Sequence, residues 1–169
     1  MGRRYCRFSL APNRAGGNCA IGENDESLVF RVAFGDRSFL LPGDAEKSTE
    51  RSALAESTPE DVRADVLKIG HHGSKNSTTP DFLAAIQPPL AVISSGAENP
   101  YGHPAPQLLE RLQQAGITMP RTDTNGAIHI LTDGKKFKVS CFVACPDISA
   151  KLNSAKPQPP QDQQGNLQQ

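Results

Sequence analysis

The sequence predicts an α/β fold, and three observations lead to this class. Short apolar runs rich in β-branched residues alternate with helical patterns between residues 27 and 116. Two of these runs, at 38–41 and 66–69, end in glycine-containing motifs that carry Asp or His. Polar loops at strand ends are where α/β sheets place ligands and metals, because those loops converge over a rigid core. We therefore expect a layered α/β domain with its site at the strand ends.

The elements follow from local signals along the chain. A two-residue turn, Gly35-Asp36, predicts a hairpin, and Asp133-Gly134 predicts another near the end of the domain. Thr79 followed by Pro80 is a helix start, with Thr as the N-cap and Pro at the first helical position. Gly116 is a helix stop. Strands are expected at 28–34, 37–41, 66–69, 90–94, 117–119, 127–132 and 136–143, and helices at 45–55, 79–86 and 106–115.

Length and composition predict one domain with flanking irregular segments. The chain has 169 residues, of which 37% are hydrophobic, enough for a modest core. We expect an irregular N-terminal arm at 1–26, the folded domain at 27–146 and a disordered Pro/Gln-rich tail at 147–169, its apolar content falling to almost nothing from about Asn153. Lys plus Arg equals Asp plus Glu, at 18 each, so no global field draws in a polyanion. The sequence has no apolar run long enough for a membrane span, and it has no recognisable secretion signal. We therefore expect a soluble chain of unknown location.

The four cysteines, Cys6, Cys19, Cys141 and Cys145, have no C-x-x-C spacing. A zinc site built from them is the weaker interpretation, and buried or surface thiols are the stronger one. We assign them no chemistry. His129 alternates with apolar residues and is expected to be an ordinary strand residue.

A candidate site is marked by two adjacent histidines. His71 and His72 directly follow the predicted strand 66–69 and lie between two glycines. One alternative is that one imidazole caps a carbonyl group while the other faces water. The second strand end favours a functional role, because it presents Asp44, and a carboxylate with an imidazole suits a borderline metal such as zinc.

Four ordered motifs carry a family resemblance. They are N-D-E-S-L-V at 24–29, F-L-L-P-G-D-A-E at 39–46, D-V-L-K-I-G-H-H-G-S-K at 65–75 and N-P-Y-G-H-P at 99–104. Together they resemble the metallo-β-lactamase-like domain at the C-terminus of the ComEC family of DNA-internalisation competence proteins. The resemblance covers about residues 24–132. It implies an αββα sandwich whose strand-end loops bind two zinc ions that activate a water for hydrolysis.

The resemblance also assigns roles to residues. It implies that Asp44 bridges the two metals and that His71 or His72 is a ligand, with the other supporting the site; all three are the expected catalytic and metal residues. Which histidine binds stays open. His103 is expected either to contact a substrate phosphate or to be a structural turn residue. Ser74 and Lys75, with Ser77, line a phosphate site or simply form a polar loop.

One departure from the family decides the functional expectation. No H-x-H-x-D-H motif occurs in the sequence, which has only four histidines. Catalytic zinc needs about three protein ligands, so we expect the C-terminal half of the sandwich, a partial fold with an incomplete two-metal site. The implied function is a metal-dependent hydrolase for a phosphodiester or nucleic acid, linked to DNA uptake. In that family the domain is attached to an inner-membrane channel.

Two functional outcomes are left open. A chain or segment with the missing N-terminal half is the expected partner, and this chain alone is expected to be inactive or weakly active; the alternative is a remnant or binding module without catalysis. Two structural expectations follow. Asp44 should lie within about 5 to 6 Å of one histidine, the span of two zinc bonds. Half a sandwich should leave an apolar sheet face uncovered, so the chain should associate.

Overall fold

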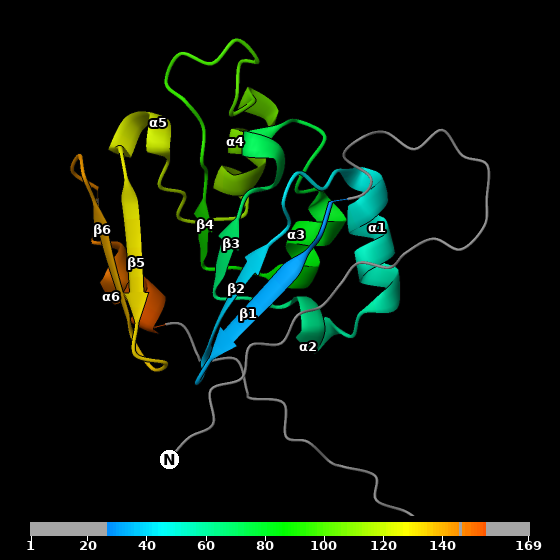
Figure 1. The fold of residues 1–169 in the computed structure, drawn as a ribbon, viewed down its shortest axis with the longest axis horizontal. Coiled ribbons are helices and arrows are strands. Elements are labelled where there is room, and N and C mark those ends of the chain that lie inside the picture. Colours follow the sequence, from blue (N-terminus) through cyan, green and yellow to red (C-terminus); the bar gives the residue numbers. More distant parts are fainter. Residues whose placement is uncertain (1–26, 146, 155–169) are drawn as a thin grey trace, which may run out of the picture.

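The computed structural model describes residues 27–145 and 147–154. Within them the chain forms a mixed α/β fold, the class that the sequence predicts. A four-stranded sheet has the order β1-β2-β3-β4, and a separate two-stranded sheet is made of β5 and β6 (Figure 1). The strands are β1 (Phe30–Phe34), β2 (Arg37–Leu41), β3 (Val66–Lys68), β4 (Leu90–Val92), β5 (Ile128–Thr132) and β6 (Phe137–Cys141). The helices are α1 (Lys47–Glu56), α2 (Pro59–Val62), α3 (Pro80–Ile86), α4 (Pro106–Gln114), α5 (Thr122–Asn125) and α6 (Ile148–Ser154).

The connections explain why β2, β3 and β4 end at one edge. β1 and β2 form the antiparallel hairpin that Gly35-Asp36 predicts. β2 pairs parallel with β3, and β3 pairs parallel with β4, with helices in the connections. Parallel strands joined by crossover helices place their carboxyl ends side by side. The segments after β2, β3 and β4 therefore meet at one edge.

The pleat of the sheet separates the core into two clusters. Leu40, Leu67 and Ala91 lie in register on one face, because successive side chains of a strand alternate between faces. Helices α1, α3 and α4 cover this face, and the sheet and helix residues form one buried cluster. Figure 1 shows these helices on the same side of the sheet.

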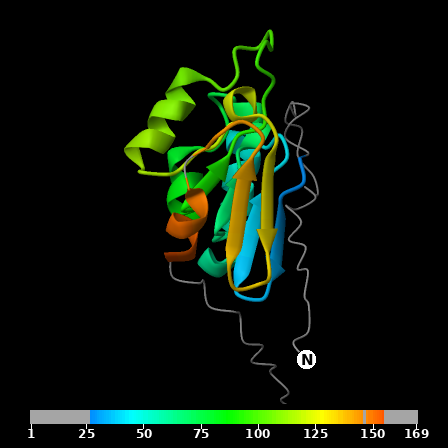
Figure 2. The same cartoon turned by 90° about the vertical axis from the view of Figure 1, so that its left-hand side faces the viewer.

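The β5-β6 hairpin and α6 cover part of the opposite face. Val66 and Leu90 pack there with Phe137 of β6 and with Ile148 and Leu152 of α6. Figure 2 looks onto this hairpin, which lies in front of the main sheet. The expectation of an uncovered apolar face is therefore wrong for the β3-β4 part of the sheet, because the chain's own C-terminal elements bury it.

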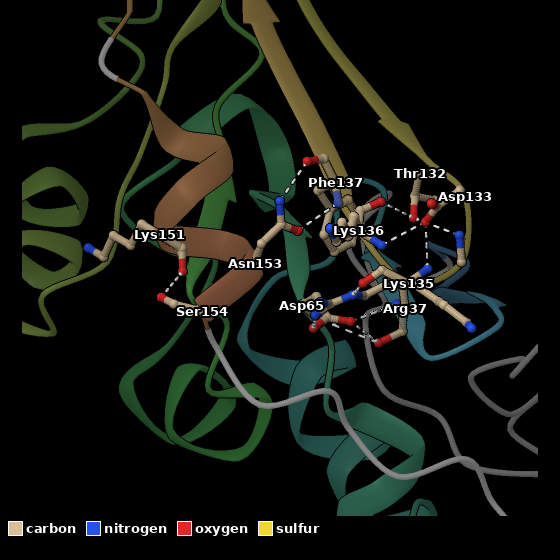
Figure 3. Close-up of polar contacts among 12 residues, drawn as sticks. Arg37, Asp65, Thr132, Asp133, Lys135, Lys136, Phe137, Lys151, Asn153 and Ser154 are labelled. Atoms are coloured by element: carbon tan, nitrogen blue, oxygen red, sulfur yellow. Dashed lines mark hydrogen bonds and ion pairs between the residues drawn. The ribbon is translucent and has the colours of Figure 1, made fainter.

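A buried ion pair ties the hairpin to the sheet (Figure 3). Arg37 Nη1 lies 3.2 Å from Asp65 Oδ1, and both side chains are almost completely buried. Arg37 also donates from Nε to the carbonyl oxygen of Lys135 at 2.7 Å and lies over the ring of Phe137. The second Asp65 oxygen accepts from the Ser38 amide at 2.8 Å. One carboxylate thus holds β2, and the arginine it pairs with holds the β5-β6 turn.

Three sequence-based expectations need correction. The tail expected from residue 147 begins with α6, because Ile148 and Leu152 find an apolar partner in β6 and the Asn153 side chain bonds both the amide and the carbonyl group of Phe137. The predicted strand at 117–119 makes a single isolated parallel bridge, between Thr118 and Leu90 of β4. Cys141 and Cys145, expected as thiols, form a disulfide with Cα atoms 5.8 Å apart.

The described helices include none that combines the length and the apolar character of a membrane span.

Candidate metal and substrate site

The turn Gly70–Gly73 after β3 has an unusual backbone. His71 and His72 have φ of 45° and 53°, and Gly73 has φ of 93°. Positive φ in non-glycine residues costs free energy and is concentrated at functional sites. A Cβ on Gly73 would lie 2.7 Å from Cβ of Pro104, so glycine is required for this close approach. The turn therefore brings the two histidines against the 95–105 loop.

His72 is turned toward Asp44. Its Nδ1 lies 2.8 Å from the carbonyl oxygen of Ser94, so Nδ1 carries the donated hydrogen. In the neutral ring the lone pair is then on Nε2, which lies 3.9 Å from Asp44 Oδ1. The distance between Asp44 and His72 is inside the 5 to 6 Å span expected from the sequence. A histidine whose far nitrogen donates to a carbonyl group is oriented as metal-binding histidines are.

Asp44 follows β2 in a turn that the histidine segment helps to hold. The His71 amide donates to the carbonyl oxygen of Gly43 at 3.1 Å, and the Ala45 amide donates to Pro42 at 3.1 Å. Asp44 is partly exposed, with 43% of its side chain accessible. Burial lowers the pKa of the neighbouring Lys68, and the negative charge of Asp44 opposes this shift. The site thus presents a carboxylate to solvent with a cation nearby.

His71 points to a different partner. Its Nδ1 lies 2.9 Å from Glu46 Oε1, and each side chain is 27% exposed. Ser74, which is buried, lies with Oγ 3.4 Å from the same Glu46 oxygen. Glu46 is the N-cap residue of α1 but makes no capping bond with its side chain. Its carboxylate instead orients His71.

His103 completes a row of three histidines. Its ring centroid lies 5.8 Å from that of His71, and its Nδ1 is buried without a hydrogen-bond partner among the described residues. Burial, and then the charges of His71 and His72, lower the pKa of His103, while Glu46 opposes the shift. The lowered pKa favours the uncharged form of the His103 ring, which lies beside the histidine turn.

Three other residues weighed in the sequence, Lys75, Ser77 and His129, make no contact with Asp44 or the histidine pair through their side chains in the interactions described. Lys75 is exposed on the loop after the turn, where no described residue forms a hydrogen bond or an ion pair with it. Ser77 is fully buried and donates to the carbonyl oxygen of Gly70 at 2.8 Å, so its role is structural. His129 is exposed on β5, in the separate hairpin. The structure brings together Asp44, His71, His72, Ser74 and His103.

The donor set matches part of a zinc site. Residues 27–145 and 147–154 contain no group of three or more His, Cys, Asp or Glu side chains arranged to hold a metal. Asp44 and His72 have the donor chemistry and the separation of two ligands on one zinc ion. The described residues therefore fit two ligands of a zinc ion.

Sequence reasoning missed Glu46 as a site residue. In the sequence it appears as the last residue of the motif at 39–46, with no predicted role in the site. Its position two residues after Asp44, in the same strand-end loop, was the available signal. Only the structure shows that its carboxylate faces His71.

We expect Glu46→Ala to change the tautomer of His71. A hydrogen bond to a carboxylate stabilises the Nδ1-H form by roughly 1.5 to 3 kcal/mol, so its loss should raise the ratio of the Nε2-H form to the Nδ1-H form by about tenfold or more. Long-range ¹H-¹⁵N correlation spectra measure this ratio. Glu56→Ala, at the exposed end of α1, is the matched control and should leave the His71 signals unchanged. Identical His71 spectra in Glu46→Ala and the parent would contradict the assignment.

Comparison with known proteins gives a consistent set of relatives. No protein-family model matches the chain. The chain is 43% identical over 106 residues to ComE operon protein 3 of Bacillus subtilis, a match that covers 63% of this chain and 13% of that protein. It is 39% identical over 108 residues to competence protein ComA of Neisseria gonorrhoeae, covering 64% of this chain and 16% of that protein.

A third relative is recombination protein 2 of Haemophilus influenzae, 37% identical over 108 residues and covering 64% of this chain and 13% of the relative. The chain thus spans 13 to 16% of the length of these three relatives. Over nearly two thirds of its own length, it is similar to proteins named for the ComE operon, competence and recombination.

Proposed function

We propose that this chain carries part of the metal site of a metallo-β-lactamase-like, zinc-dependent hydrolase that cleaves phosphodiester bonds during DNA uptake. The similarity to a competence protein supports the assignment to DNA uptake. The mixed α/β sheet with its polar strand ends is compatible with the C-terminal half of an αββα sandwich. The observation that carries the proposal is the pair of Asp44 and His72, 3.9 Å apart at the ends of neighbouring strands.

The residues present have distinct tasks in this proposal. Asp44 and His72 would hold zinc, and the Ser94 carbonyl oxygen, which accepts from Nδ1 of His72, fixes the His72 ring. Bound zinc supplies Lewis acidity toward a phosphoryl oxygen and lowers the pKa of a water. Glu46 orients His71, and Ser74 supports Glu46. His103 and the exposed Lys75 lie on adjoining loops and contact the substrate phosphate.

The count of ligands requires a second contributor. Catalytic zinc is held by about three protein ligands, and a two-metal site needs more. The chain has no H-x-H-x-D-H motif. We propose that a segment or polypeptide with this motif packs against the domain and supplies the remaining ligands.

Reconstitution tests this function. The 169-residue chain alone, with zinc, should hydrolyse bis-p-nitrophenyl phosphate at the background rate. Addition of a polypeptide with the H-x-H-x-D-H half should raise the rate by a factor of about 100 or more, because zinc then gains its full ligand set. The same polypeptide with its motif histidines changed to alanine is the control.

The ligand count also favours a second function, a binding module without catalysis. A complex that forms but shows only the background rate would support this second function over the hydrolase.

A further inference from the structure

One exposed aromatic ring adjoins the candidate site. Tyr101, 79% exposed, lies in the loop between β4 and α4. Its ring is stacked on that of His103 at 6.0 Å between centroids and 24° between planes. His103 in turn contacts His71 edge to face. The tyrosine is therefore the outer member of a row of rings that leads to the histidine turn.

The loop holds this ring in a defined place. Asn99 donates from Nδ2 to the carbonyl oxygens of Gly96 and His103, at 2.7 and 2.6 Å, and accepts from the His103 amide at 2.9 Å. The Ala105 amide then donates to Gly73 at 2.8 Å. A Cβ added to Gly102, the residue after Tyr101, would meet no atom within 4 Å. The ring thus stands, largely exposed, on a loop that hydrogen bonds hold in place.

We propose that Tyr101 is a stacking platform for a nucleobase of a single-stranded substrate whose phosphodiester lies at Asp44 and His72. The inference rests on the proposed function and adds the substrate class. Stacking on an exposed aromatic ring is a general way to bind unpaired bases, since every base has a π-face. In a duplex the bases are already stacked, so the platform favours a single strand.

The charges of the loop support a base over a phosphate as the group that it binds. Residues 95–102, the part of the loop up to Gly102, contain no Lys, Arg or His, and their one charged side chain is Glu98. His103, which contacts the phosphate in the proposed function, follows this part. A negatively charged loop repels a polyanion but not an uncharged base. In this proposal the uncharged base stacks on Tyr101, and the phosphate of the same substrate lies at the histidines.

The sequence allows a direct test of contact. The chain has no tryptophan and two tyrosines, Tyr5 and Tyr101. In a Tyr5→Phe variant, Tyr101 is the single tyrosine fluorophore. Titration with a short oligothymidylate, in EDTA, should quench its emission in a saturable way. An abasic oligonucleotide of the same length keeps the phosphates but should cause no quenching.

Affinity is measured by anisotropy of the labelled oligothymidylate, also in EDTA. Tyr101→Leu should weaken binding about tenfold, within the range for loss of one stacked base, whereas Tyr101→Phe should bind like the parent. Phe142→Ala is the matched control, because Phe142 is an exposed aromatic residue just after β6, on the separate hairpin.

Three results would overturn the inference: no oligonucleotide binding by the parent, equal binding by Tyr101→Leu, or equal quenching by the abasic strand. The outcome is independent of hydrolysis, since no metal is present. Retained base-dependent binding without activity after reconstitution would leave the platform standing and reject the hydrolase.

Discussion

Asp65→Ala is expected to lower the free energy of unfolding by about 3 to 5 kcal/mol, the cost of leaving a buried charge without its partner. Arg37 would remain buried and would lose its carboxylate, and the Ser38 amide would lose its acceptor. The β5-β6 hairpin should loosen as well, because Arg37 also bonds Lys135. Urea denaturation followed by circular dichroism measures the loss.

Asp81→Ala is the matched control, since Asp81 is exposed in the first turn of α3, and a change below about 1 kcal/mol is expected. The double variant Arg37→Met, Asp65→Leu should recover much of the loss, because no buried charge remains. An Asp65→Ala protein as stable as the parent would show that the pair does not hold the hairpin.

Asp44→Asn is expected to remove at least about 99% of the activity gained on reconstitution, because a neutral amide is a poor ligand for a divalent cation and cannot bridge two of them. Asp44 is partly exposed in a turn, so the fold should be unaffected. Initial rates with bis-p-nitrophenyl phosphate at saturating zinc measure the effect. Asp81→Asn is the control, and full activity of Asp44→Asn would exclude Asp44 from the metal site.

The strands and helices set by local signals were predictable. Gly35-Asp36 gives the β1-β2 hairpin, and the Thr79 side chain caps α3 through the Phe82 amide. Elements that depend on distant partners were not. The α6 segment has few apolar residues, and two of them, Ile148 and Leu152, are buried against the main sheet and β6. The residues at 117–119 have strand composition, yet the segment forms only one isolated bridge with β4.

The candidate site also has features that the sequence predicts and features that it does not. The sequence predicts two strands that are each followed by polar residues, Asp44 after one and His71 and His72 after the other. If these strands are parallel neighbours, Asp44 must lie near a histidine. Which histidine turns toward it depends on the left-handed backbone of His71 and His72, which no residue pattern specifies. The orientation of Glu46 was likewise inaccessible, because it depends on a contact with His71 in another loop. The stacking of Tyr101 on His103 depends on the backbone path of their shared loop, which the residue pattern does not specify.

Zinc content after dialysis tests the partial metal site most directly. The unaided 169-residue chain, loaded with zinc and dialysed against metal-free buffer, should retain less than about one zinc ion per chain, because two ligands hold the ion weakly. The complex with the H-x-H-x-D-H polypeptide should retain about two. Two zinc ions on the unaided chain, with turnover of the phosphodiester, would contradict the account.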